Sequence, residues 1–424
     1  MASEAPLLAQ VAEGDQELAS TSGNAARSLD VVAGSMALTG TMLGGGLLSL
    51  PYAASFVGLS GAVVLILASG AVNVFSYELI ASSARLAGPV HGKSFNSLAA
   101  FALGETHGRR VALSMLLVLC FLASVGYLLL CGKLAAEALE DRPHVSSRRV
   151  ATLGAAFLVT PLSLFKNVHA LRYANLFTVL AAVLLMVAVV VKSTENGRGT
   201  GVNVGGPNDI SDLMFAMPFF LLAFSAQFSV LPVLSELVHP TAPRMQFVTR
   251  SAGVLGAIIY TTIAVAGYLF TGDKVCDSIF SNFDRRDFLC TLGRVAVIVS
   301  LILSYPLLIM PCRGVVFDLC GLDDNAREVS HSATTLAIVA ISCLCAVLAP
   351  NVAVVWSLAG STVTIWISFT LPSLFFLEAS KQDPSEWVRR IAAHVLFVFS
   401  VVASVGCSVM AVLRSSSSDA CAGN

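Results

Sequence analysis

The sequence predicts an all-α integral membrane protein with eleven membrane-spanning helices. Of its 424 residues, 56% are hydrophobic and only 12% are charged, whereas soluble domains carry about 25% charged residues. The apolar residues gather in eleven stretches, most of them close to the roughly 20 residues that a helix needs to cross a bilayer. These observations predict a membrane domain over residues 31–413, between a disordered cytoplasmic tail at 1–30 and a short tail at 414–424.

The eleven predicted spans follow one another through mostly short connections. The fourth and ninth are the shortest, and a Gly- and Asn-rich connection at 193–211 is expected to be mobile. With the N-terminus in the cytoplasm, the inner segments hold 14 Lys and Arg residues and the outer segments hold 11, which agrees in sign with the positive-inside rule. In chain order, the spans are expected near residues 31–55, 60–83, 110–132, 149–165, 170–192, 212–235, 249–271, 291–313, 333–350, 353–377 and 390–413.

Composition and motifs exclude several classes of function. A net charge of −1 leaves no broad basic surface for nucleic acid. Residues 87–94 match a degenerate phosphate-loop pattern, but that loop works only between a strand and a helix of a soluble α/β domain, so we expect no bound nucleotide. The sequence has no nucleophile-elbow motif and no paired metal ligands. It therefore predicts a protein that is not an enzyme and needs no metal or cofactor, apart from a possible coupling ion.

Two of the ten cysteines share a hydrophilic connection between spans. Cys276 and Cys290 lie at its two ends, and they form a candidate disulfide if this connection faces an oxidising compartment. The alternative is that both remain free thiols.

The first predicted span is interrupted by three consecutive glycines, Gly44, Gly45 and Gly46. Each glycine costs about 1 kcal/mol in a helix relative to alanine, so three together favour local unwinding. Unwinding frees amide groups at the start of a half-helix, where the dipole favours a carboxylate. The alternative is close helix packing through small residues, because Gly40 and Gly44 have the required spacing.

The sixth predicted span has a polar interruption of its own, with Phe224, Ser225 and Gln227 ahead of Pro232. A proline inside a helix leaves a backbone carbonyl without its donor, and such a carbonyl can accept from an ammonium group or bind a cation. The alternative is a simple kink, with Gln227 bonded to a neighbouring helix. Ala226 precedes Pro232 by six residues, as Gly45 precedes Pro51. Matching breaks five spans apart predict a five-plus-five inverted repeat with one extra helix.

One acidic residue falls within a predicted span. Glu78 lies near the inner end of the second span, where a carboxylate is costly and can mark a proton path. The alternative is that Glu78 reaches the membrane interface or pairs with Arg85.

Four stretches together resemble the amino acid/auxin permease family, and within it the sodium-coupled neutral amino acid transporters and the vacuolar amino acid transporters. They occur in the family's order over about residues 30–413. The strongest is Val-Leu-Pro followed by Glu-Leu in the sixth span, with a downstream Pro and an Arg-Met pair. The four stretches lie at 44–53, at 230–245, at 271–279 and at 305–313.

This resemblance implies an eleven-span form of the bacterial leucine-transporter fold, with an L-amino acid held between the broken first and sixth helices. By position, the three glycines would take the carboxylate, with Thr41 beside them. Phe224, Ser225 and Gln227 would line the opposite side. Ser304 falls where sodium-coupled members place a hydroxyl ligand.

One departure from the family pattern counts against sodium. Sodium-coupled members carry two asparagines just before the glycines, and residues 37–42 of this chain contain none. Thr39, Thr41 and Ser304 could replace the lost oxygens. We favour coupling to protons, for which Glu78 is a candidate carrier, or facilitated exchange.

The sequence thus predicts a secondary active transporter that moves neutral L-amino acids by alternating access, coupled to protons or sodium. Its partners would be the amino acid and the lipid bilayer, with no nucleic acid or nucleotide. The membrane would be the plasma membrane or that of an endolysosome or vacuole. Two alternatives are an amino-acid-binding nutrient sensor of transporter fold, and a channel or carrier for another small organic solute.

Overall fold

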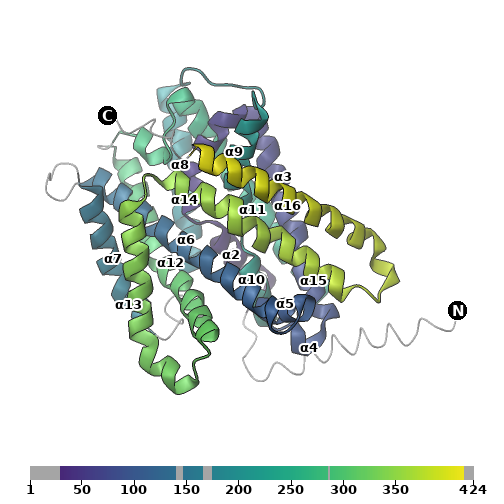
Figure 1. The fold of residues 1–424 in the computed structure, drawn as a ribbon. Coiled ribbons are helices and arrows are strands. Elements are labelled where there is room, and N and C mark those ends of the chain that lie inside the picture. The colour runs from purple at the N-terminus through teal and green to yellow at the C-terminus, as the bar shows by residue number, and fades with distance from the viewer. Residues whose placement is uncertain (1–28, 140–146, 166–173, 285–286, 415–424) are drawn as a thin grey trace.

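The computed structural model describes residues 29–139, 147–165, 174–284 and 287–414. Within them the chain forms a bundle of helices (Figure 1), and the one strand-like feature is an isolated bridge between Leu29 and Leu237. The all-α prediction is confirmed. The predicted tails lie outside the described residues, apart from Leu29, Asp30 and Arg414.

The first half of the chain contains the first predicted break and the long helices that surround it. Its helices are α2 (Val31–Met42), the 3-10 helix η1 (Gly45–Ser49), α3 (Leu50–Leu86), α4 (Gly88–His91), α5 (Phe95–Leu103), α6 (His107–Ala138), α7 (Arg148–Leu164) and α8 (Ala174–Asn196).

The second half begins with another interrupted pair of helices. Its long elements are α9 (Ile210–Ala223), α10 (Gln227–Glu236), α11 (Ala242–Thr271), α12 (Phe288–Cys320), α13 (Asp324–Leu348), α14 (Val352–Ala359), α15 (Leu371–Ala379) and α16 (Trp387–Arg414). Between α14 and α15 lie two π-helical segments, η5 (Gly360–Thr364) and η6 (Trp366–Thr370). Short 3-10 turns are η3 (Gly272–Lys274), η4 (Ile279–Asn282) and η7 (Pro384–Glu386).

Among the described residues, nine helical stretches are long and apolar enough to cross a membrane. The chain is therefore a multi-pass membrane protein. The fourth predicted span forms α7, which has only 17 residues. The fifth forms α8, and its first four predicted residues, 170–173, lie outside the described part of the chain. Large apolar side chains such as Phe157 and Val395 are exposed on the outer surface, as expected for helices surrounded by lipid.

The first and second predicted spans meet at a kink inside α3. Gly58 has φ 70° and ψ 172° there, a conformation that glycine adopts without steric cost. A Cβ atom at this position would lie 2.3 Å from the carbonyl oxygen of Gly205. Gly58 therefore allows both the sharp turn and the close approach of the connection that follows α8.

That connection was expected to be mobile, and the structure corrects this prediction. Residues 199–205 form a strap that is held by backbone hydrogen bonds to α3 and α11. Leu59 N donates to Asn203 O at 2.9 Å, and Gly199 N donates to Leu269 O at 2.8 Å. The Asn203 amide also donates to the Tyr268 hydroxyl at 2.9 Å. The backbone groups of this strap thus find hydrogen-bond partners on neighbouring helices.

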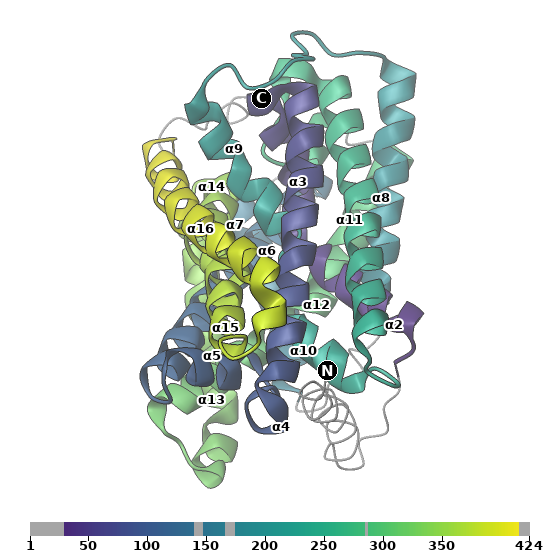
Figure 2. The same ribbon diagram turned by 90° about the vertical axis from the view of Figure 1, so that its right-hand side faces the viewer.

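The helices of the two halves pack against each other near the bundle centre. α3 lies along α11, with α8 beyond it (Figure 2). The two helices approach so closely that a Cβ at Gly253 would lie 2.4 Å from the Val74 side chain. This contact brings the two interrupted regions together.

Candidate substrate site between two interrupted helices

The first interruption is located at the glycines. α2 ends at Met42, and Gly44 is extended, with φ −90° and ψ −170°, before η1 begins at Gly45. The first amide groups of a helix have no acceptor within it. Gly45 and Gly46 occupy those positions, so the break presents backbone donors inside the bundle.

The three glycines have different surroundings. A Cβ at Gly44 would lie 2.8 Å from the Tyr127 hydroxyl, whereas a Cβ at Gly45 would lie 2.9 Å from Leu130 and 3.1 Å from Trp356. At Gly46 no atom lies within 4 Å of that position. Gly45 therefore has the environment of a packing residue, Gly46 borders open space, and Gly44 faces a hydroxyl group.

The packing alternative describes Gly40 well. A Cβ there would lie 2.7 Å from both the Cβ and the carbonyl oxygen of Asn175 on α8. Small residues allow such close helix contacts in membranes. The glycines of the first span thus serve two purposes: Gly40 allows close helix packing, and Gly45 and Gly46 lie at the start of η1, where amide groups have no acceptor within the helix.

The second interruption lies at residues 224–226. α9 ends at Ala223, Ala226 has the non-helical values φ −143° and ψ 24°, and α10 begins at Gln227. Pro232 lies inside α10, after the break. The polar interruption expected from the sequence is therefore where the helix stops.

Tyr260 of α11 joins the two breaks. Its hydroxyl lies 2.8 Å from the carbonyl oxygen of Met42 and 2.6 Å from that of Ala223, which are the last residues of α2 and α9. A hydroxyl has a single proton to donate. Two carbonyl groups therefore share one proton, and at any moment one of them has acceptor capacity that Tyr260 does not use.

Phe224 is held between two tyrosines. Its ring packs edge-on against Tyr260 at a centroid distance of 4.9 Å, and its carbonyl accepts from the hydroxyl of Tyr77 on α3. Phe224 and both tyrosines are fully buried. The backbone at the second break is thereby fixed from two sides.

Gln227 belongs to a buried polar network. Its Nε2 donates to Asn73 Oδ1 at 2.8 Å, and its Oε1 accepts from Ser368 Oγ at 2.9 Å. Ser225 Oγ lies 3.2 Å from both Gln227 Oε1 and Ser368 Oγ. These contacts match the alternative in which Gln227 is bonded to neighbouring helices. Ser225 is only half-buried.

The hydroxyl groups considered for ion coupling do not gather in one place. Thr39 and Thr41 donate to carbonyls of their own helix, at 2.8 and 3.0 Å. Ser304 lies 3.2 Å from Thr178 Oγ1, to which Ser300 also donates at 2.9 Å. Within the described residues no hydrogen bond links Ser304 to either threonine. Ser304 instead joins a hydroxyl cluster between α12 and α8.

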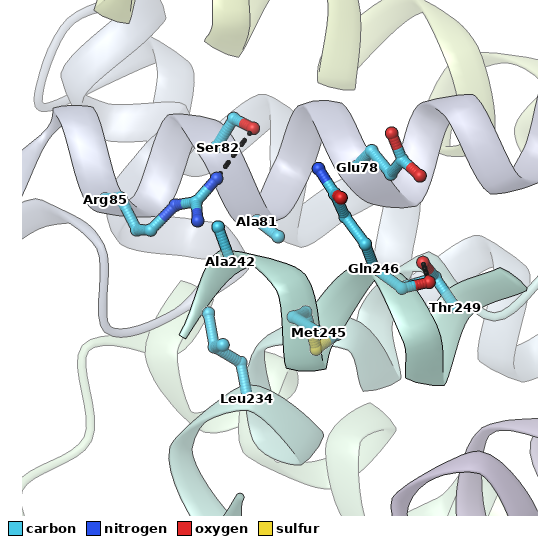
Figure 3. Close-up of a pocket in the computed structure, with 9 residues that line it drawn as sticks. All are labelled: Glu78, Ala81, Ser82, Arg85, Leu234, Ala242, Met245, Gln246 and Thr249. Carbon is cyan, nitrogen blue, oxygen red and sulfur yellow. Dashed lines mark hydrogen bonds between the residues drawn. The ribbon is translucent and has the colours of Figure 1, made fainter. Parts of the chain in front are cut away.

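Glu78 lines a small pocket between α3, α10 and α11 (Figure 3), and no residue of either break lines that pocket. It accepts from Arg250 Nε at 2.9 Å, and Arg389 lies 3.9 Å away. Arg85, the partner considered from the sequence, donates to Ser82 Oγ at 3.2 Å. Partners from α11 and α16 could not be inferred from local spacing.

The candidate disulfide between Cys276 and Cys290 is absent. Cys290 is a free thiol, fully buried in the first turn of α12, whereas Cys276 is disulfide-bonded. Sharing a connection in the sequence therefore did not place the two sulfur atoms together. The prediction of this bridge was wrong.

The connection that holds Cys276 is anchored by Asp277. Its carboxylate pairs with Lys133 of α6 and accepts from the amide of Val352 at 3.1 Å. Its carbonyl accepts from Ser49 Oγ of η1 at 2.7 Å. This residue links the first interrupted span to α6 and α14, and sequence reasoning did not identify it.

Sequence reasoning also missed Tyr127, Tyr260, Asn73 and Ser368. Each is a polar side chain inside an apolar span. Such groups normally face the interior of a membrane protein and find partners there. That rule could have marked them as candidates, although it could not have told which helix each one contacts.

Comparison with known proteins identifies a family whose members this chain resembles over most of its length. The family model described as transmembrane amino acid transporter protein matches residues 27–415. Vacuolar amino acid transporter 5 of Schizosaccharomyces pombe is 27% identical over 358 residues, which cover 81% of this chain and 83% of that protein. Sodium-coupled neutral amino acid symporter 2 of Danio rerio is 22% identical, and the match covers 89% of this chain and 81% of that protein.

A further relative and a solved structure agree with this picture. Amino acid transporter AVT6E of Arabidopsis thaliana is 25% identical, and the match covers 87% of this chain and 80% of that protein. The solved structure is Mhp1, a nucleobase-cation-symport-1 family transporter in a closed conformation with bromovinylhydantoin bound. It superposes with a TM-score of 0.58 at 14% identity and covers 92% of each chain. The two chains therefore share a fold.

Proposed function

The chain belongs to the transmembrane amino acid transporter family, and on this premise we propose that it carries neutral L-amino acids across a membrane by alternating access. The family resemblance noted in the sequence is thereby confirmed, and the relatives are named as transporters, not enzymes. The observation that carries the proposal is the convergence of two interrupted helices on Tyr260, whose single hydroxyl lies within hydrogen-bond distance of the last carbonyl group of each helix.

In this proposal the substrate completes the hydrogen bonding of both breaks. Its carboxylate binds the amide groups at the start of η1, next to Gly44 and the Tyr127 hydroxyl. Its ammonium group binds whichever of the Met42 and Ala223 carbonyls lacks the proton of Tyr260. Helix N-termini favour anions, and exposed carbonyls of broken helices favour cations.

The residues around this site favour a neutral substrate side chain. Tyr127, Phe224, Ser225 and the glycines carry no formal charge. A charged substrate side chain would have to leave water without a partner, at a cost of several kcal/mol. In this proposal a small or medium apolar side chain occupies the space beside Gly46, where no atom lies within 4 Å of an added Cβ.

We propose an eleven-span architecture built as a five-plus-five inverted repeat. α2 through α8 would form the first repeat, α9 through α15 the second, and α16 the extra helix. Support comes from the two breaks, each of which divides the first span of its half, and from the shared fold with a transporter. Alternating access requires that the substrate binds both the outward-open and inward-open states, with affinities that shift their populations.

We propose proton coupling in preference to sodium. A sodium site needs several oxygen ligands, and the threonines of α2 use their hydroxyls within their own helix. The strongest candidate for a sodium site is the hydroxyl cluster of Thr178, Ser300 and Ser304. The same helix, α8, also contacts α2, because Asn175 donates to the Ala37 carbonyl at 3.4 Å.

We place the N-terminus in the cytoplasm and the protein in a vacuolar or endolysosomal membrane, in keeping with the vacuolar relative.

Uptake of labelled amino acids into proteoliposomes tests this function. Proton and sodium gradients are imposed separately, and empty liposomes serve as the control. We expect uptake of neutral amino acids that a proton gradient accelerates. No uptake of any amino acid under either gradient would overturn the proposed function, and uptake driven only by sodium would overturn the choice of ion.

A further inference from the structure

A second cavity is lined by the connection from α5 to α6 and by the turn from α12 to α13. Figure 2 shows α5 and α13 close together at one end of the bundle. Its volume is about 620 Å³. One wall comes from residues 105–113, where the connection from α5 enters α6. The other comes from residues 318–327, where α12 passes into α13. Neither the family resemblance nor the substrate site assigns a role to it.

The cavity walls carry more positive than negative charge. Three arginines line it, namely Arg109, Arg110 and Arg327, against the two acids Glu105 and Asp318. Asp318 lies 2.9 Å from Arg327 and 3.7 Å from Arg109, so it orients two guanidinium groups toward one region. Arg110 has no ion pair among the described residues. The cavity therefore has an unneutralised guanidinium beside two that are held in position.

The start of α6 brings the positive end of its helix dipole to the cavity. α6 has 32 residues, and the Thr106 side chain makes no capping bond at its N-terminus. Thr106 lines the cavity together with the arginines. Guanidinium groups match phosphate oxygens in geometry and bind them through paired hydrogen bonds. The positive end of a helix dipole favours the same ligand.

The position of the cavity favours a lipid as the source of that phosphate. It lies at the ends of α6, α12 and α13, all of which are apolar enough to cross a membrane. Leu113, Leu319 and Leu322 line it beside the arginines. A phospholipid offers a negative headgroup for the basic part and acyl chains for the apolar part. Basic pockets between spans are a known kind of site for such headgroups.

We propose that this cavity binds the phosphate of an anionic phospholipid headgroup. Arg110 and Arg109 contact the phosphate oxygens directly, Arg327 is held in place by Asp318, and the leucines contact the upper part of the acyl chains. The bound lipid then joins the start of α6 to the turn between α12 and α13.

The test measures the melting temperature of the purified full-length protein in neutral detergent, titrated with phosphatidylserine, phosphatidylcholine or inorganic phosphate. We expect phosphatidylserine to raise the melting temperature in a saturable way, because a ligand that binds the folded state stabilises it. Phosphatidylcholine, which is zwitterionic, should raise it much less at the same concentration.

Variants connect the effect to the cavity. Arg110→Gln removes no ion pair, so its melting temperature without lipid should equal that of the wild type. Its affinity for phosphatidylserine should fall about tenfold, as expected for loss of a charge-assisted contact. The matched control is Arg390→Gln, a half-buried arginine on α16 outside the cavity, which should bind like the wild type.

Three results would overturn the proposal. One is an equal effect of phosphatidylserine and phosphatidylcholine on the wild type. Another is an Arg110→Gln variant that binds phosphatidylserine as tightly as Arg390→Gln does. The third is an equal effect of inorganic phosphate at the same concentration, which would assign the cavity to a soluble phosphate and not to a lipid.

Discussion

The two interrupted regions are built in different ways, and the difference separates backbone that can meet a substrate from backbone that the protein has already satisfied. The first break consists of glycines, and Gly46 borders open space. The second contains polar side chains that bind Asn73 and Ser368, and its Phe224 carbonyl is already bonded to Tyr77. We infer that the first break supplies most of the substrate contacts and that the second is largely a preformed support.

The largest expected effect comes from Gly45→Leu. A leucine there would meet Leu130 and Trp356 at less than contact distance, so η1 could not keep its place against α6 and α14. Uptake in proteoliposomes should fall to background while the protein still inserts into membranes, which fractionation measures. Near-normal uptake would mean that the first break tolerates rearrangement and that its geometry does not matter for transport.

Gly46→Val tests whether the glycines of the first break form a substrate site or only allow close packing. The added side chain enters open space, so the melting temperature should stay close to that of the wild type. Because the same space would hold the substrate, uptake should fall about 100-fold, as for loss of about 2.7 kcal/mol of binding. A stable variant with unchanged uptake would show that substrate does not approach this glycine.

Tyr260→Phe tests the connection between the two breaks. The substitution keeps the ring and removes the hydroxyl that serves Met42 and Ala223. A buried hydrogen bond contributes about 1 kcal/mol, so stability should fall by a similar amount, and the KM for uptake should rise about tenfold as the breaks move apart. Tyr268→Phe is a control, because within the described part of the chain its hydroxyl is bonded to the strap and to neither of these two carbonyl groups. Equal KM values in both variants would contradict the proposed role.

The smallest effect on substrate affinity is expected for Gln227→Ala. This change removes the donor to Asn73 Oδ1 and one acceptor of the Ser368 hydroxyl, which still lies 3.2 Å from Ser225 Oγ. Because the Asn73 oxygen is then buried without a donor, stability should fall by about 1–3 kcal/mol. The KM for uptake should change less than threefold, roughly 0.7 kcal/mol, because Gln227 contacts protein groups. A KM that rises by the same factor as in Tyr260→Phe would place Gln227 in the substrate site, and the contrast between the two breaks would disappear.

Much of this arrangement could be predicted from the sequence because glycine and polar residues within apolar spans have strong local effects. The three glycines and the Ser225–Gln227 segment marked both breaks within a residue or two. The partners of those breaks were less predictable. Tyr260 and Ser368 reach them from α11 and η6, and no local pattern specifies which distant helix a buried hydroxyl meets.

The errors have a similar cause. Cys276 and Cys290 share a connection, but sequence proximity carries no information about the distance between two sulfur atoms. Glu78 took partners from α11 and α16 because helix packing brought Arg250 and Arg389 closer than a residue two turns away. The strap at 199–205 looked mobile because its glycines are flexible in isolation, and its backbone bonds come from other elements.

The strap also matters to anyone who wishes to label this protein. An epitope or fluorophore inserted between Gly199 and Gly205 would separate backbone pairs with Leu59 and Leu269, and it would push against the kink at Gly58. Such a tagged protein would report on distorted segments of α3 and α11. Topology mapping by insertion should therefore avoid this segment, even though its composition makes it look like the safest place in the chain.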